Sequence, residues 1–154
     1  MTQTELQAIA VGAALNAGLD PALVCAVCAR ESSWNPDATR YEAGFFSRYI
    51  ESMKGLSEEE KTNRATSYGL MQIMGQTARE QGFDGPLESL KEPLNAVTQG
   101  CRKLKHCLAL SGGNVEGALL HYNGGGEPKY PQLVMIHYSD YAHLRGDGGK
   151  DASA

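Results

Sequence analysis

Apolar and polar residues recur with the spacing of amphipathic helices over most of this 154-residue chain. Gly18, Asp20 and Pro21 mark a helix end followed by a helix start, because glycine ends helices, aspartate caps them and proline fits their first turn. The predicted helices cover about residues 4–17, Pro21 to the SSWNP segment, a stretch ending at Gly82, and about 93–110, 114–122 and 131–144.

Residues 37–66 are less regular, and a small β-hairpin there is compatible with the pattern. Such a long irregular segment in a small domain is more often functional than not. We therefore expect a mainly α fold with one domain over residues 1–145, followed by a disordered tail over residues 146–154.

The stretch LVCAVCARESSWNP places a glutamate, Glu31, on the apolar face of its predicted helix. Glu31 follows Val24 by seven residues and Val27 by four, which are the spacings of one helical face. A carboxyl group there loses hydration, and the resulting rise in its pKa suits a general acid. An ion pair with Arg30 or Arg40 is the alternative, and position alone favours that alternative.

The net charge of −4 and the isoelectric point near 5.5 argue against nucleic acid as a partner, because phosphate binding needs a clustered basic surface. Arg102, Lys103 and Lys105 lie on one predicted helix, and we expect them to form a solvated face. The sequence has no apolar run long enough to span a membrane. We expect a monomer.

Four cysteines, Cys25, Cys28, Cys101 and Cys107, allow a zinc site, two disulfides or a redox-active CxxC. Buried, reduced thiols are favoured instead, because Cys28 and Cys101 lie on apolar helical stripes and buried cysteine behaves as a small hydrophobe. We therefore predict no metal and no organic cofactor.

Three motifs occur in a fixed order along the chain: ESSWNP, SYGLMQIM and LLHYNGGG. Together they resemble the catalytic core of soluble-type lytic transglycosylases, relatives of goose-type lysozyme that cut the glycan strands of peptidoglycan. The resemblance covers roughly residues 20–145 and implies a lysozyme-like fold. The stretches TRYEAGFF and RATSYGLMQ most resemble copies encoded by phages and prophages.

The resemblance also implies roles for single residues. Glu31 matches the catalytic acid and base of the family. Met71 and Gln72 match the segment that lines the cleft, where Gln72 would bind sugar hydroxyl or acetamido groups. Tyr122 and Asn123 match the pair that faces the catalytic glutamate, and the Tyr122 hydroxyl would orient the Glu31 carboxyl.

Other positions match the family less directly. Tyr141 is our candidate for its late tyrosine, with Tyr138 as the competitor. Ser67 is a candidate for the serine of the family pattern, because ATSY replaces the usual Gly-Ala element here. The candidates for stacking on sugar rings are Trp34, Tyr41, Phe45 and Tyr49.

The number of carboxylates decides the reaction. Hydrolysis needs a second carboxylate near the first, whereas a lytic transglycosylase works with one, since the sugar's own 6-hydroxyl attacks. Glu42 is the leading second carboxylate, ahead of Asp37 and Glu51, although a salt bridge to a nearby arginine explains Glu42 equally well. Lytic transglycosylase is therefore the first prediction, followed by a muramidase using Glu42 and by an inactive wall-binding or virion structural protein.

The N-terminal stretch MTQTELQAIAVGAALNAG has no basic region and interleaves apolar with polar residues, which argues against a secretory signal peptide. We therefore expect synthesis in a cytoplasm and action on the cell wall in the periplasm. Delivery would depend on a holin-type lesion, carriage in a virion or a secretion machine.

Overall fold

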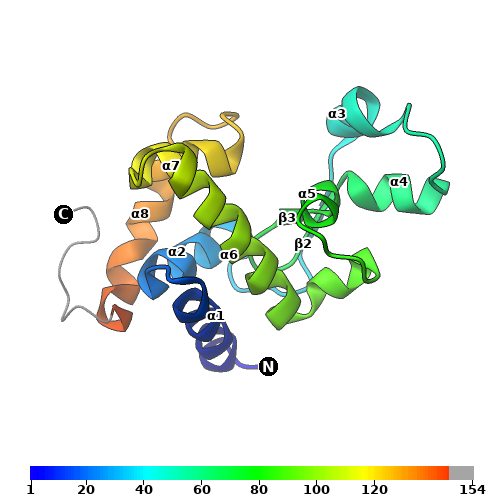
Figure 1. Ribbon diagram of the computed structural model, residues 1–154. Coiled ribbons are helices and arrows are strands. Elements are labelled where there is room, and N and C mark those ends of the chain that lie inside the picture. Colours follow the sequence, from blue (N-terminus) through cyan, green and yellow to red (C-terminus); the bar gives the residue numbers. More distant parts are fainter. Residues whose placement is uncertain (146–154) are drawn as a thin grey trace.

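The computed structural model describes residues 1–145, which are mainly helical (Figure 1), as the sequence predicts. The predicted tail over residues 146–154 lies outside the described residues. The longer helices are α1 (Gln3–Ala17), α2 (Pro21–Ser32), α6 (Pro93–Leu110), α7 (Val115–Asn123) and α8 (Tyr130–Tyr141). The shorter ones are α3 (Ala43–Phe45), a π-helix (Phe46–Ile50), α4 (Glu58–Arg64), α5 (Gly75–Glu80) and two 3₁₀ turns (Leu87–Lys91 and Ala142–Leu144).

A three-stranded antiparallel sheet begins within residues 37–66, where the sequence is compatible with a small hairpin, and extends beyond them to Met74. Its strands are β1 (Thr39–Tyr41), β2 (Thr66–Tyr68) and β3 (Ile73–Met74), in the order β1-β2-β3. Arg40 pairs with Ser67 across the first two strands. The long segment between β1 and β2 folds into α3, the π-helix and α4, so it is a helical excursion from the sheet rather than a tight turn.

The elements fall into two groups (Figure 1). We call α1, α2, α6, α7 and α8 the helical lobe, and residues 39–91, which hold the sheet and α3 to α5, the sheet lobe. Helix α6 runs from beside the sheet lobe into the helical lobe, where it packs on α1 and α7. The core residues of the helical lobe surround α2, which is buried along nearly its whole length.

Helix α2 is fixed at both ends. At its start, the Asp20 side chain accepts a hydrogen bond of 2.9 Å from the backbone N–H of Ala22 and one of 2.6 Å from the Tyr138 hydroxyl of α8. Just beyond its end, the Trp34 indole N–H donates to the Tyr141 hydroxyl over 2.8 Å. Glu31, two residues beyond the buried part of α2, is therefore carried on a rigid support.

The turn between β2 and β3 packs closely on α6. Gly69 has a φ of 76°, which favours glycine, and a side chain there would collide with the carbonyl oxygen of Leu90. Gly100 of α6 leaves room for the Met71 side chain, which fills the space a Cβ atom would occupy. These two glycines allow the SYGLMQIM segment to approach the centre of the molecule.

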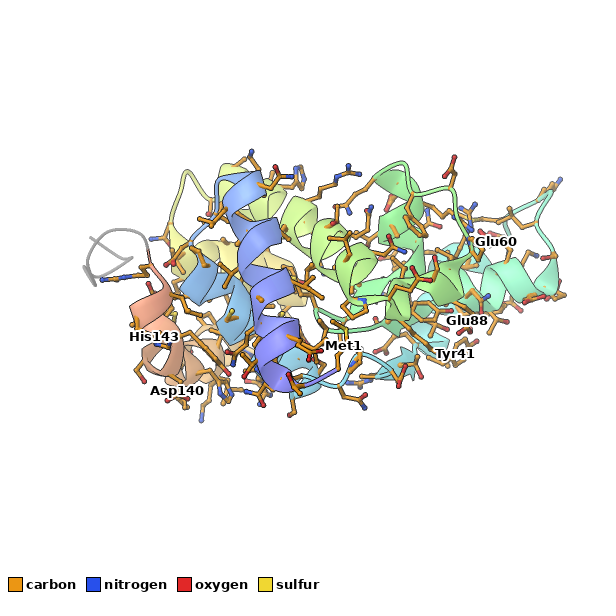
Figure 2. All side chains as sticks on the ribbon, turned by 90° about the horizontal axis from the view of Figure 1, so that it is seen from below. Met1, Tyr41, Glu60, Glu88, Asp140 and His143 are labelled. Atoms are coloured by element: carbon orange, nitrogen blue, oxygen red, sulfur yellow. The ribbon has the colours of Figure 1, made fainter. Side chains whose placement is uncertain are left out.

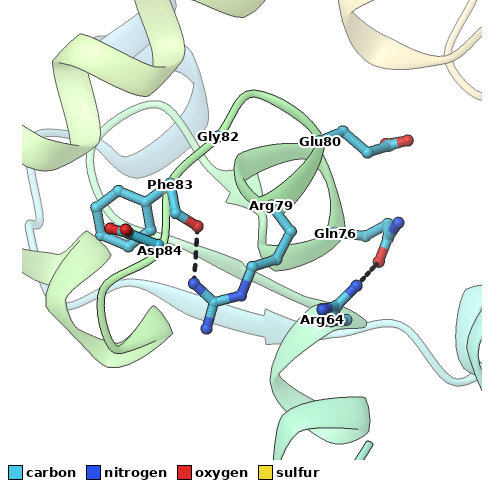
Figure 3. Close-up of a pocket in the computed structure, with 7 residues that line it drawn as sticks. All are labelled: Arg64, Gln76, Arg79, Glu80, Gly82, Phe83 and Asp84. Atoms are coloured by element: carbon cyan, nitrogen blue, oxygen red, sulfur yellow. Dashed lines mark hydrogen bonds between the residues drawn. The ribbon is translucent and has the colours of Figure 1, made fainter. Parts of the chain in front are cut away.

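A half-buried group of charged side chains joins the elements of the sheet lobe. Glu60 of α4 accepts hydrogen bonds from Arg64 over 3.2 Å and from Arg79 of α5 over 2.7 Å, and this pairing lowers the pKa of the Glu60 carboxyl. Arg79 also donates to the Phe83 carbonyl, and Arg64 to Gln76, as Figure 3 shows. The pocket in Figure 3 is therefore lined by arginines that already have partners within the fold.

All four cysteines are buried, free thiols within the hydrophobic core. Burial raises the pKa of Cys25 and of Cys101 to about 12. Within residues 1–145, no three His, Cys, Asp or Glu side chains are grouped so that they could hold a metal ion. No helix of the described part of the chain is long and apolar enough to cross a membrane.

Candidate active site

A cavity of about 620 Å³ opens between the two lobes, and we call it the Glu31 cavity. Its size is typical of small-ligand sites. Side chains from the end of α2, from the sheet, from α6 and from the end of α7 line it. Seven residues singled out from the sequence meet there: Glu31, Glu42, Phe45, Ser67, Gln72, Tyr122 and Asn123.

The Glu31 carboxyl is half-buried at the last turn of α2 and accepts a hydrogen bond of 2.7 Å from the Tyr130 hydroxyl. Burial raises the pKa of Glu31, and this effect outweighs the opposing effect of the Tyr130 hydrogen bond. The positive charges of Lys103, Arg30 and Arg40 also oppose the rise. Glu31 is thus a carboxyl group that stays protonated to higher pH than an ordinary glutamate.

Tyr130 is the site residue that the sequence did not reveal. Its hydroxyl remains a donor, because burial and the neighbouring Glu31 carboxylate both raise the pKa of Tyr130. Tyr130 begins α8, directly before Pro131 at the second position of that helix. The two tyrosines predicted from the sequence, Tyr138 and Tyr141, lie near the other end of the same helix. The sequence feature that points to Tyr130 is its place shortly after the YNGGG turn.

Tyr122 does not have the role predicted for it. Its hydroxyl donates to the backbone carbonyl of Met71 over 2.7 Å, so it does not orient Glu31. Its ring lies parallel to the Tyr130 ring, with centroids 6.5 Å apart and planes at 7°. Tyr122 therefore supports Tyr130 from one side while one of its own surfaces faces the Glu31 cavity.

Tyr141, predicted to bind substrate, does not line the Glu31 cavity. Tyr141 is buried between α2 and α8, where its ring meets Trp34 edge to face at 6.0 Å. Tyr138, the competitor, is bonded to Asp20 at the start of α2. Both tyrosines fix the helix that carries Glu31, and neither lines the Glu31 cavity. Trp34 is buried with them and is not available to stack on sugars.

Two neighbouring residues of the SYGLMQIM segment, Met71 and Gln72, have different surroundings. Met71 is fully buried and does not line the cavity, which corrects its predicted contact with substrate. Gln72 does line it, and its side-chain N–H groups donate to the carbonyls of Ala38 and Gly69, each over 3.0 Å. Its amide oxygen is then the group that can accept from a sugar hydroxyl.

The end of α2 is joined directly to this segment. The Ser32 hydroxyl lies 2.8 Å from the Leu70 carbonyl oxygen and donates to it. The catalytic candidate and the turn that carries Gln72 are therefore neighbours fixed by a hydrogen bond across 38 positions of sequence.

Strand β1 directs alternate side chains to opposite faces. Arg40 and Glu42 both line the Glu31 cavity, whereas Tyr41 between them does not. Tyr41 is 49% exposed, lies 6.1 Å from the Phe46 ring and stands at the surface of the sheet lobe (Figure 2). Of the predicted aromatic residues, Phe45 lines the cavity and Tyr41 does not.

Glu42 satisfies both interpretations drawn from the sequence. It lines the Glu31 cavity, as a second carboxylate would. It also forms a salt bridge with Arg40, with 3.0 Å between Nε and Oε1. Arg40 also lines the Glu31 cavity, so the salt bridge and the second-carboxylate position occur together.

Asn123 shapes the lip of the cavity. With its amide oxygen turned toward the glycine-rich loop, it accepts hydrogen bonds from the backbone N–H of Glu127 over 2.7 Å and of Gly126 over 3.2 Å. Gly124 ends α7 with a φ of 76°. The loop that follows α7 is thereby folded back beside Glu31.

Lys103 departs from the solvated face predicted for α6. Arg102 and Lys105 are exposed, but Lys103 is half-buried and lines the Glu31 cavity. Its ammonium nitrogen stands 4.1 Å from the centroid of the Tyr122 ring. Burial lowers the pKa of Lys103, while the Cys107 and Glu31 side chains act to raise it.

With this geometry established, comparison with known proteins identifies one match. The family model of the transglycosylase SLT domain matches residues 9–132, which is well over half of the chain. Comparisons with curated proteins and with solved structures gave no significant match. The matched region contains Glu31, Gln72, Tyr122, Asn123 and Tyr130.

Proposed function

Because the chain belongs to the transglycosylase SLT domain family, we propose that it cleaves the bond between N-acetylmuramic acid and N-acetylglucosamine in peptidoglycan with Glu31 as its single acid and base. The family match supports a glycan-cleaving enzyme that acts on peptidoglycan. The observation that carries the assignment of Glu31 is its place in the cavity, half-buried and held by the Tyr130 hydroxyl.

In the first step, protonated Glu31 gives its proton to the oxygen of the glycosidic bond. That bond breaks, the N-acetylglucosamine hydroxyl leaves, and positive charge develops at the anomeric carbon of N-acetylmuramic acid. The raised pKa of Glu31 supports this role, because it keeps the proton available at a pH where an exposed glutamate has lost it.

In the second step, the Glu31 carboxylate accepts the proton of the 6-hydroxyl of the same muramic acid. The oxygen so released bonds to the anomeric carbon and forms a 1,6-anhydro ring, and no water is consumed. Attack within one sugar has a large proximity advantage over attack by a separate molecule. Tyr130 stabilises Glu31 while it is charged between the two steps.

The salt bridge between Arg40 and Glu42 favours this reaction over hydrolysis. A hydrolase would use Glu42 to activate water or to bond to the sugar, and one of the Glu42 carboxylate oxygens already contacts Arg40. Hydrolysis remains the second candidate because Glu42 lines the same cavity as Glu31.

The test is mass spectrometry of the soluble fragments that the protein releases from purified peptidoglycan. We expect fragments lighter by one water than hydrolysis products, with 1,6-anhydromuramic acid ends, and at least about 100-fold slower release by Glu31→Gln. Glu127→Gln is the matched control, since Glu127 also lines the cavity but accepts a hydrogen bond from the backbone of Lys129.

Reducing ends that depend on both Glu31 and Glu42 would show that water attacks, and the protein would then be a muramidase. If neither kind of end depends on Glu31, the enzymatic proposal is wrong. A wall-binding protein on the same fold would then be the remaining interpretation.

A further inference from the structure

A second cavity, of about 650 Å³, lies along α6. The two cavities share one lining residue, Lys103. Helices α5, α6 and α7 supply the walls of the second cavity. The second cavity is therefore a neighbour of the Glu31 cavity, with the Lys103 side chain at the place where the two meet.

The second cavity has a basic lining in a chain whose net charge is −4. Arg102, Lys103 and His106 come from α6, and His121 comes from α7. Glu80 of α5 is the one acidic side chain of that lining. Carboxylates are the ligands that such a group of cationic and imidazole donors binds best, through charge-assisted hydrogen bonds.

The proposed substrate carries such groups. Each muramic acid of peptidoglycan bears a short peptide, attached at its lactyl group, with several free carboxylates. Extended at about 3.3 Å per residue, a peptide of three or four residues reaches roughly 10–13 Å from the sugar. We propose that the second cavity binds the carboxylates of this peptide stem, which makes the protein selective for glycan strands that carry stems. This inference rests on the proposed function.

In this proposal each charged or imidazole side chain that lines the second cavity has a role in binding the stem. Arg102 is exposed and reaches the Gln81 carbonyl with one of its N–H groups, so its other donors face solvent and ligand. His106 and His121 are exposed at the same cavity. Glu80 is the partner for a free amino group of the stem. Lys103 stands where sugar and stem would meet.

The experiment compares two forms of one substrate: peptidoglycan with its stems, and the same glycan after an amidase has removed them. We expect the wild type to prefer the stem-bearing form. In Arg102→Gln/His106→Gln, the ratio of kcat/KM for stem-bearing over stem-free strands should fall about tenfold. Lys105→Gln removes a charge from the same helix outside both cavities and should keep the wild-type ratio.

A direct binding measurement makes the outcome independent of catalysis. Free tetrapeptide stem, added to labelled wild-type protein, should shift the nuclear magnetic resonance signals of His106 and His121. The double variant should show a much weaker shift of the His121 signal. High salt should weaken the binding, because the contacts are between charges.

Two results would overturn the stem-binding inference: the same ratio of rates in the wild type and the double variant, or no shift of the two histidine signals in the wild type. Neither result contradicts the proposed function if formation of 1,6-anhydromuramic acid ends still depends on Glu31. If no 1,6-anhydromuramic acid ends form but the stem still shifts the two histidine signals, the proposed function is wrong and stem binding is supported.

Discussion

The Glu31 carboxyl has one hydrogen-bond donor, Tyr130, and an environment that otherwise disfavours its charge. This combination suits a group that must hold a proton and then release it. The structure divides the task between two tyrosines, because Tyr130 touches Glu31 while Tyr122 fixes the Met71 carbonyl and packs against Tyr130. Tyr130 and Tyr122 therefore have different roles, although their rings are neighbours.

Tyr130→Phe removes the one hydrogen bond that stabilises the charged form of Glu31, so the pKa of Glu31 should rise further. A bond to a charged group contributes about 1.5–3 kcal/mol, and we expect kcat to fall about 10–100-fold. Activity declines as pH rises through the pKa of Glu31, so this decline should begin at higher pH in the variant. Measured pH profiles of kcat/KM check both effects.

Tyr122→Phe is the control for that experiment. It removes a bond to the Met71 carbonyl, so it should lower the free energy of unfolding and leave the alkaline limb of the pH profile in place. An unshifted limb in Tyr130→Phe would show that the hydrogen bond does not act on Glu31.

At the level of elements, the position of α6 against the β2–β3 turn determines whether Gln72 faces the cavity. Gly100 is the point of closest approach, because the Met71 side chain occupies the space beside its Cα atom. A glycine in the middle of a helix ordinarily weakens it. Its presence here is explained by packing.

Gly100→Ala should lower the free energy of unfolding by about 1–3 kcal/mol, because the new methyl group displaces Met71. It should also lower kcat/KM, since Gln72 moves with the turn. Gly12→Ala in α1 is the matched change, with open space around the added group, and should stabilise the protein by about 0.5–1 kcal/mol. Urea denaturation of both variants measures the contrast, and equal effects of the two substitutions would contradict the packing argument.

The elements predicted from the sequence agree well with the structure where the helical pattern is long, as in α1, α2 and α6. Glu31 could be predicted because a carboxylate on a buried stripe violates the pattern. The contact of Tyr130 with Glu31 joins residues 99 positions apart, so the place of Tyr130 after the YNGGG turn does not by itself show which group it bonds. The position of Tyr41 outside the cavity depends on the pairing of β1 with β2, which no local pattern specifies.

For the whole molecule, the site lowers stability in a pH-dependent way. The folded state raises the pKa of Glu31, so the native protein binds more protons than the unfolded chain over the interval between the two pKa values. Stability therefore falls as pH rises through that interval. The part of the fold that serves catalysis makes the neutral-pH protein less stable than its packing alone would allow.

Glu31→Gln should consequently raise the melting temperature at pH 7, since the amide has no charge to desolvate and its oxygen can still accept from Tyr130. The advantage should disappear below roughly pH 4, where the wild-type carboxyl is protonated in both states. Calorimetric melting of both proteins across this pH range provides the measurement. A variant that is less stable than the wild type at pH 7 would contradict the account.

The four buried thiols have a consequence for how the protein tolerates its surroundings. A thiol reacts as its thiolate, and with a pKa of about 12 at Cys25 and Cys101 only about one molecule in 10⁵ is ionised there at pH 7. Oxidants and disulfide partners therefore find very little thiolate to attack at these two positions. Modification of Cys25, which is fully buried, would report that the core has opened.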